Sequence, residues 1–93
     1  MTQLMVATHL FEFAGCVVGI FHADKGKGLP QHQHRFDHIT FCCSGSCIVR
    51  NNRRELIMTK DTQPILLVAN EWHEIESLED GTVFCNVFSE SKL

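Results

Sequence analysis

Three histidines in one short run constrain this chain more than any other feature of its sequence. His32, His34 and His38 lie within Gly26–Gly45, which reads GKGLPQHQHRFDHITFCCSG, and all three are even-numbered. Side chains alternate between the two faces of an extended strand, so residues two or four apart point to the same side. We therefore predict a strand over Gln31–Cys43 that presents all three imidazoles on one face.

The same histidines also allow a helical interpretation. His34 and His38 are four residues apart, which is the spacing of zinc-binding helices. However, Pro30 directly precedes the run, and the β-branched and aromatic residues of Ile39-Thr40-Phe41 favour extended backbone. The strand is the interpretation that these residues support.

The rest of the sequence alternates between short β-prone runs and turn-forming residues. Strand-like runs recur about every eight to twelve residues, a pattern typical of an all-β barrel or sandwich. The expected strands are two within Met1–Phe21 around a turn near Gly15, then Gln31–Cys43, Cys47–Arg50, Glu55–Thr59, Ile65–Val68 and Thr82–Phe88. The expected connections are a loop over Ala23–Pro30, a tight turn at Ser44-Gly45-Ser46 that makes a hairpin of its two flanking strands, and turns at Asn51-Asn52, Lys60-Asp61 and Leu78–Gly81.

The size and charge of the chain limit its functions. Its 93 residues predict a single domain over residues 1–93, which buries roughly 60–65% of its unfolded surface and gains stability from a metal or from oligomerisation. A net charge of -3 argues against a nucleic-acid partner. The one basic cluster, Arg50, Arg53 and Arg54, adjoins turn-forming asparagines and is interpreted as a solvated turn.

Five cysteines, an odd number, argue against a disulfide framework and suit a reducing compartment. Phe13–Cys16 resembles the small-residue run before a lipoprotein cysteine. Glu12 interrupts the apolar stretch and no basic residue precedes it, so we expect no secretory signal. No window reaches the roughly 18 apolar residues of a membrane span. We therefore expect a soluble, cytoplasmic protein with no membrane partner.

The three clustered histidines predict a metal site. Three imidazoles on an apolar barrel face with no shared ligand would leave polar nitrogens unsatisfied, at about 1–3 kcal/mol each. His9 and His22 stand alone, and each is interpreted as an ordinary packed or surface side chain.

The spacing Gly26-x5-His32-x-His34-x3-His38-x6-Gly45 resembles the first motif of the cupin superfamily, which are small jelly-roll barrels, or double-stranded β-helices, that hold a metal between their strands. The family usually has glutamate where this chain has His38. The second family motif is half present: Val68-Ala69-Asn70 stands where Pro-x-Gly is usual, Trp72-His73 supplies its histidine, and Ser77 replaces its asparagine. Asn70 tolerates the left-handed backbone that glycine usually provides at this turn. The resemblance covers Gly26–Phe88.

The resemblance implies that His32, His34 and His73 are metal ligands and that His38 takes the place of the family's carboxylate. Four neutral imidazoles favour Zn, Ni, Cu or Fe(II) over Mg or Ca, and leave the ion a strong Lewis acid. If all four close a tetrahedron, the site has no open position and the metal is structural.

The resemblance implies a metal-dependent dioxygenase or isomerase that acts on a small, chelating, oxygenated molecule. The alternative is a non-catalytic module of the same fold that binds or senses a small ligand, and a third interpretation makes the metal a staple for a small core. The sequence leaves open whether the chain is an enzyme. It has no tyrosine, so a resemblance to sugar-epimerising cupins, which use a His and Tyr pair, is not supported.

Other candidate groups are weaker. Glu71 shares its strand face with His73 but is expected to be a solvated loop carboxylate, and Asp37 and Glu74 are expected to face away from the site. Cys42, Cys43 and Cys47 lack the paired spacing of a thiolate zinc site, although Cys42 shares parity with the histidines. Cys16 and Cys85 are expected to be small buried hydrophobes. The apolar first strands of a small domain predict a homodimer formed through them.

Overall fold

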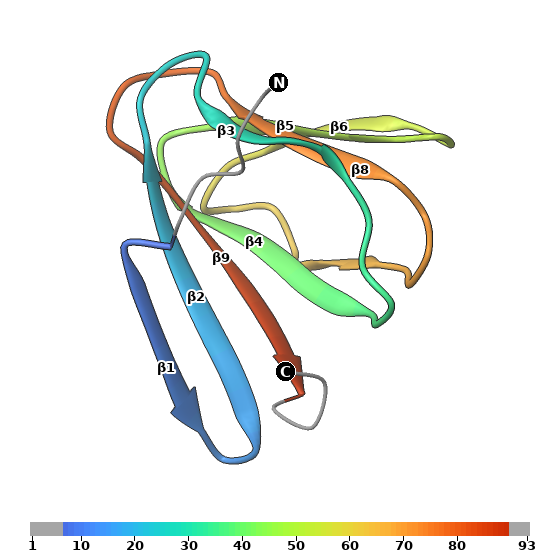
Figure 1. Ribbon diagram of the computed structural model, residues 1–93. Helices are drawn as coiled ribbons and strands as arrows, with labels where there is room; N and C mark the ends of the chain where they lie inside the picture. The colour runs from blue at the N-terminus through green and yellow to red at the C-terminus, as the bar shows by residue number, and fades with distance from the viewer. Residues whose placement is uncertain (1–6, 90–93) are drawn as a thin grey trace.

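The computed structural model describes residues 7–89, and the regular structure in that range is entirely β-strand (Figure 1). The strands are β1 (His9–Phe13), β2 (Cys16–Ala23), β3 (Gly28–His32), β4 (His38–Ser44), β5 (Cys47–Asn51), β6 (Glu55–Met58), β7 (Ile65–Leu67), β8 (His73–Ser77) and β9 (Thr82–Ser89). The first part of the expected strand region that begins at Met1 lies outside the described residues. Across residues 7–89, no helix is long and apolar enough to cross a membrane.

Two antiparallel sheets make up the fold. One has five strands in the order β1-β2-β9-β4-β7, and the other has four in the order β3-β8-β5-β6. Figure 1 shows β1, β2, β9 and β4 side by side, with β3, β5, β6 and β8 gathered across from them. The cluster of buried apolar side chains draws members from strands of both sheets, so the core lies between the sheets. The predicted all-β fold is confirmed, as two antiparallel sheets packed face to face.

The first hairpin forms where the sequence predicted it. β1 and β2 are joined by Ala14 and Gly15, whose φ angles are 53° and 79°. A two-residue turn with positive φ at both positions matches the right-handed twist of the strands that flank it. The register that follows pairs Phe13 with Cys16.

The predicted single strand over Gln31–Cys43 is wrong. β3 ends at His32 and β4 begins at His38, and no strand covers the residues between them. The two strands also belong to different sheets, because the chain crosses from the four-stranded sheet to the five-stranded one within that segment. The alternation of the histidines is therefore not one strand's pleat. In addition, the expected loop over Ala23–Pro30 is shorter, since Gly28 already begins β3.

The predicted hairpin around Ser44-Gly45-Ser46 is also wrong, although a turn is present there. β4 pairs with β7 and β9, whereas β5 pairs with β6 and β8. The turn carries the chain from one sheet to the other. Gly45 has a φ of 74°, and a Cβ at this position would lie 2.6 Å from the Thr82 Oγ1 atom. Only glycine fits this conformation and this close approach.

Apolar side chains fill the middle of the space between the sheets. The Phe21 and Phe84 rings stack with their centroids 4.9 Å apart, and Met58 and Phe84 are fully buried. Toward one end the buried residues become polar, with His38, Thr40 and His73 all at most 3% exposed. Buried polar side chains are uncommon unless they are satisfied or functional, so this end of the fold is the candidate site.

Candidate metal centre

Four histidines from three strands and one connection meet at this end. His32 is the last residue of β3, His73 is the first of β8, and the two are paired across the sheet. His38 is the first residue of β4, and His34 lies in the connection between β3 and β4. The ligating nitrogens of His32, His34 and His73 all lie within 4.8 Å of one another. The fold thus gathers the four side chains that the sequence nominated.

The His38 ring belongs to the same cluster. Its centroid lies 5.2 Å from that of His34 and 5.0 Å from that of His73, while the His32 and His73 centroids are 4.3 Å apart. His38 therefore adjoins the group formed by His32, His34 and His73, in which the ligating nitrogens of all three converge.

Backbone contacts hold the connection that carries His34 against the loop before β8. The Asn70 N–H donates to the His34 carbonyl at 2.6 Å, and the Ala69 N–H donates to the Asp37 carboxylate at 2.7 Å. Asn70 has a φ of 65°, so the expected left-handed turn at this position is confirmed. These contacts fix a segment that no sheet supports.

Hydrogen bonds set the tautomers of two histidines. The Nδ1 atom of His32 lies 2.7 Å from the Pro30 carbonyl oxygen, and that of His73 lies 3.3 Å from the Glu71 carbonyl oxygen. A carbonyl oxygen only accepts, so each Nδ1 carries the proton and donates it. The Nε2 atom of each neutral ring is then left with a free lone pair.

A buried chain of hydrogen bonds sets the tautomer of His38 in the same way. The Thr40 hydroxyl donates to Asn86 Oδ1 at 2.6 Å, so its single proton is used. The Thr40 oxygen, 3.3 Å from His38 Nδ1, must then accept from that nitrogen. His38 Nε2 is left unprotonated, as a metal-ligating nitrogen must be.

The two unprotonated nitrogens of His38 and His73 face each other. Their Nε2 atoms are 3.2 Å apart, yet with both protons on Nδ1 no hydrogen bond can join them. Two nitrogens bound to one ion at about 2.0–2.1 Å, with an angle of about 90–110° between the bonds, are separated by about 2.9–3.4 Å. The observed separation is therefore the one that two ligands of a shared ion require, and the donor set fits a divalent transition metal.

Burial keeps these histidines neutral. Removal from water and, to a smaller extent, the neighbouring imidazoles together lower the pKa of His38 to about 3 and that of His73 to about 4. The pKa of His34 is also lowered, first by burial and then by His32. Neutral imidazoles have lone pairs available at pH 7, so no proton competes strongly with a metal there.

A cavity of about 190 Å³ lies beside the histidines. Its lining residues are Leu10, Gly19, Phe21, Leu29, His34, Phe36, His38, Asn86 and Phe88. None of them carries a carboxylate, an ammonium or a guanidinium group. The site therefore combines a polar nitrogen cluster with an apolar chamber.

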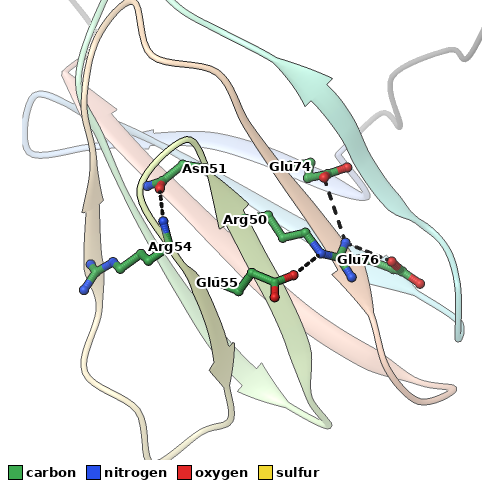
Figure 2. Close-up of polar contacts among 6 residues, drawn as sticks. All are labelled: Arg50, Asn51, Arg54, Glu55, Glu74 and Glu76. Atoms are coloured by element: carbon green, nitrogen blue, oxygen red, sulfur yellow. Dashed lines mark hydrogen bonds and ion pairs between the residues drawn. The ribbon is translucent and has the colours of Figure 1, made fainter.

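The candidate carboxylates lie outside the cluster. Glu71 forms an ion pair with Arg53 at 2.8 Å, and the Asp37 carboxylate accepts from the backbone as described above. Glu74 lies near Arg50 on the outer side of the four-stranded sheet, where Arg50 also pairs with Glu55 and Glu76 (Figure 2). Their orientations agree with the sequence-based expectation for Asp37 and Glu74.

The cysteines form no thiolate site within residues 7–89, where His32, His34 and His73 are the one group of ligating side chains close enough to hold an ion. All five are free. Cys42 lies in the apolar core and does not line the cavity, because its thiol bonds to the Ser44 carbonyl. Cys85 is buried as expected, but Cys16 is only partly buried. Cys43 is exposed, and its sulfur lies 3.3 Å from the sulfur of Cys85.

Sequence reasoning missed Thr40 and Asn86, which orient His38. Thr40 is two residues from His38 on one strand face, so its parity was a usable signal. Asn86 lies 46 residues further along the chain, and no spacing connects it with the histidines.

Comparison with known proteins gives a match at the level of structure only. No protein-family model matches the sequence, and no curated protein matches it. The chain is similar in structure to KdgF from Halomonas sp., with a TM-score of 0.75 and 18% identity over 85% of this chain and 73% of that one. It is also similar to a cupin-2 domain protein from Shewanella frigidimarina, with a TM-score of 0.73 and 8% identity over 97% of this chain and 85% of that one.

A cupin protein from Bacteroides fragilis is a third match, with a TM-score of 0.68 and 18% identity over 99% of this chain and 86% of that one. Identities this low establish the fold and no activity. The chain has the cupin fold, and its histidine cluster suggests a divalent metal.

Proposed function

We propose that this cupin-fold chain binds one divalent transition metal through His32, His34, His38 and His73. We further propose that the metal binds a small oxygenated molecule, which occupies the adjoining cavity. The 3.2 Å approach of two unprotonated Nε2 atoms, those of His38 and His73, carries the proposal. In a metal-free protein this contact has no attractive partner. A shared cation supplies one.

Four neutral imidazoles restrict the choice of metal. They favour Zn, Ni or Fe(II) over the hard ions that prefer oxygen. They also leave the full double charge on the ion, which favours an anionic, chelating group on the ligand. When bound, the metal supplies a Lewis acid and a point that orients the substrate.

The chain's own residues orient and shield this site. Thr40 and Asn86 fix the His38 ring through the hydrogen-bond chain, and Phe36 stacks on the His34 ring with centroids 5.0 Å apart. No carboxylate lines the cavity, and the chain has no tyrosine. A reaction that moves protons with a protein acid or base has little support here, so we favour dioxygenation of a chelated substrate over isomerisation.

The same scarcity of acid and base groups favours a second candidate, a module that binds or senses a small ligand without converting it. Oxygen consumption by Fe(II)-loaded protein, measured with a panel of small chelating acids and enols, separates the two. Turnover identifies an enzyme, and saturable binding without turnover identifies a sensor.

We also propose a cytoplasmic location. All five cysteines are free thiols, which supports a reducing compartment.

Elemental mass spectrometry of untagged protein tests the metal. We expect about one Zn, Ni or Fe per chain in the wild type, and a loss of most of it in His34→Ala and His38→Ala. His22→Ala is the matched control, because His22 is an exposed histidine outside the cluster. A wild type that contains no metal and takes up none on addition of Zn, Ni or Fe(II) would contradict the proposal. Unchanged affinity in His38→Ala would remove His38 from the ligand set.

A further inference from the structure

The walls of the cavity point to a class of ligand. We infer that the site takes a compact molecule with a bidentate, anionic oxygen head and an apolar body, an inference that rests on the proposed metal. The head binds beside the histidines. The body occupies the chamber between the sheets.

The chamber is lined by hydrocarbon from both sheets. Phe21 and Leu29 lie at its buried side, at most 9% exposed, and Leu10 lies near its exposed side. Phe36 stacks between the His34 ring and the Phe88 ring, whose centroid is 4.8 Å away. The part of a metal-bound ligand that extends into this chamber therefore contacts aliphatic and aromatic side chains.

Polar atoms occur only on the histidine side of the lining. They belong to His34, His38 and Asn86, and the Asn86 oxygen already accepts from Thr40. A second charged group on the ligand would lose its water without gaining an ionic partner, which is strongly unfavourable. The one centre able to neutralise an anionic head is the metal.

The volume sets the size of the body. An engineered cavity of about 150 Å³ binds benzene, so about 190 Å³ accommodates a branched aliphatic or monocyclic group and little more. Polymeric or extended substrates do not fit, except through a terminal unit.

Two 2-oxo acids with the same chelating head and the same number of non-hydrogen atoms test this class. The body of α-ketoisocaproate is an isobutyl group, and that of oxaloacetate carries a second carboxylate. Binding to Zn-loaded protein is measured by titration calorimetry, after the zinc content is confirmed. We expect α-ketoisocaproate to bind about 15–60-fold more tightly, the effect of burying two or three methylene equivalents.

Phe88→Ala is the variant that tests the wall, with Ile57→Ala, exposed on the outer side of the other sheet, as control. We expect Phe88→Ala to weaken the binding of α-ketoisocaproate about tenfold and Ile57→Ala to leave that binding unchanged, with the same zinc content in both variants. If zinc-loaded wild type binds oxaloacetate as tightly as α-ketoisocaproate or more tightly, the inferred ligand class is wrong, but the proposed metal site is unaffected. Failure to load zinc, nickel or iron would overturn both.

A different observation carries a second inference, on the outer side of the five-stranded sheet. The strand registers place Phe11, Val18, Val87, Ile39 and Leu66 in one row across all five strands. Phe11 is 47% exposed, Ile39 43% and Leu66 55%. We propose that this apolar row is the centre of an interface with a second copy of the chain.

The charge of this face fits a second copy. The outward positions of its described strands are His9, Phe11, Phe13, Cys16, Val18, Ile20, His22, Ile39, Phe41, Cys43, Leu66, Val83, Cys85, Val87 and Ser89, and none is acidic, lysine or arginine. In a chain of net charge -3, two copies can meet here about a twofold axis without like-charge repulsion. The outer side of the other sheet, with Arg50 among three carboxylates, offers no such surface.

The area is adequate for a dimer. Five strands spaced about 4.8 Å apart and about 20 Å long give a face of roughly 500 Å² in projection. Two such faces bury roughly 1,000 Å² in total, which is about the lower bound for a specific interface.

Light scattering after size exclusion tests the dimer. We expect a mass twice the chain's 10.6 kDa for wild type and for Ile57→Lys, and a monomer for Ile39→Lys and Leu66→Lys, with circular dichroism confirming that each variant is folded. A wild type that is monomeric at every concentration would overturn the proposal. A folded Ile39→Lys and Leu66→Lys that both remain dimeric would do so as well.

Discussion

The interior of this small barrel has two regions, and each draws its side chains from both sheets. The apolar centre, which is Phe21, Val49, Met58, Ile75 and Phe84, excludes polar side chains and is at most 9% exposed. The histidine end is as deeply buried at His38 and His73, but it is held by hydrogen bonds instead of by hydrocarbon packing. Among residues 7–89, every buried side-chain nitrogen or oxygen has a polar neighbour at hydrogen-bonding distance, and for the Nε2 atoms of His38 and His73 that neighbour is the other unprotonated nitrogen. The comparison teaches that the centre supplies stability through apolar packing, while the other end buries polar side chains, which stabilise the fold less.

Truncation at the apolar centre should have the largest effect on folding. Phe84→Ala removes a fully buried ring that stacks on Phe21, and leaves a cavity between the sheets. We expect the free energy of unfolding to fall by about 3–5 kcal/mol, measured by urea denaturation of the metal-free protein. Ile57→Ala, at an exposed site, should lose well under 1 kcal/mol. A comparable loss in both variants would remove the distinction between core and surface.

Acid should destabilise the histidine end selectively in the metal-free protein. The pKa values of His38 and His73 fall to about 3 and about 4 in the folded chain, from an ordinary value of 6.5. Between those values the unfolded chain binds more protons, so stability is complete above pH 6.5 and falls as the pH is lowered toward 4. Each histidine contributes a slope of at most about 1.4 kcal/mol per pH unit.

Urea denaturation at pH 7.5, 6 and 5 with a chelator present measures this slope. His38→Gln should be less sensitive to acid than the wild type, because glutamine does not titrate. The same pH dependence in both proteins would show that His38 is not held neutral by burial.

The smallest effect should come from the residues that orient the histidines. Thr40→Val keeps the shape of a fully buried side chain but breaks the link between His38 Nδ1 and Asn86. We expect metal affinity to fall by about 10–100-fold, in competition titrations with a chromophoric chelator. Thr40→Ser restores the hydroxyl and should bind within a few-fold of the wild type. If valine binds as tightly as threonine, the hydrogen-bond chain has no role in the site.

Local sequence predicted the elements better than their pairing. The Ala14-Gly15 turn and the left-handed Asn70 were both predictable, because a turn depends on the few residues that form it. The hairpin expected around Gly45 was wrong, because a glycine turn joins strands of different sheets as readily as strands of one. Pairing depends on distant strands, and no local pattern encodes it.

The histidine cluster was predicted for a reason that was only partly correct. The parity of His32 and His34 suggested one strand, and His38 was placed on it by the same alternation. In the structure the chain leaves one sheet after His32 and enters the other at His38. The cluster still forms, because the connection is short and His32 and His38 stand at its two ends, one in each of the two packed sheets.

The sequence by itself determined the chemistry available to this protein, which offers several imidazole nitrogens and no tyrosine. It also determined the fold class, since short β-prone runs broken by turn residues have few other arrangements. Only the tertiary structure decided which nitrogens face one another, that Asn86 orients His38 through Thr40, and that the chamber beside them is apolar. Those outcomes depend on contacts between residues far apart in the chain, and the packing of two sheets is what brings such residues together.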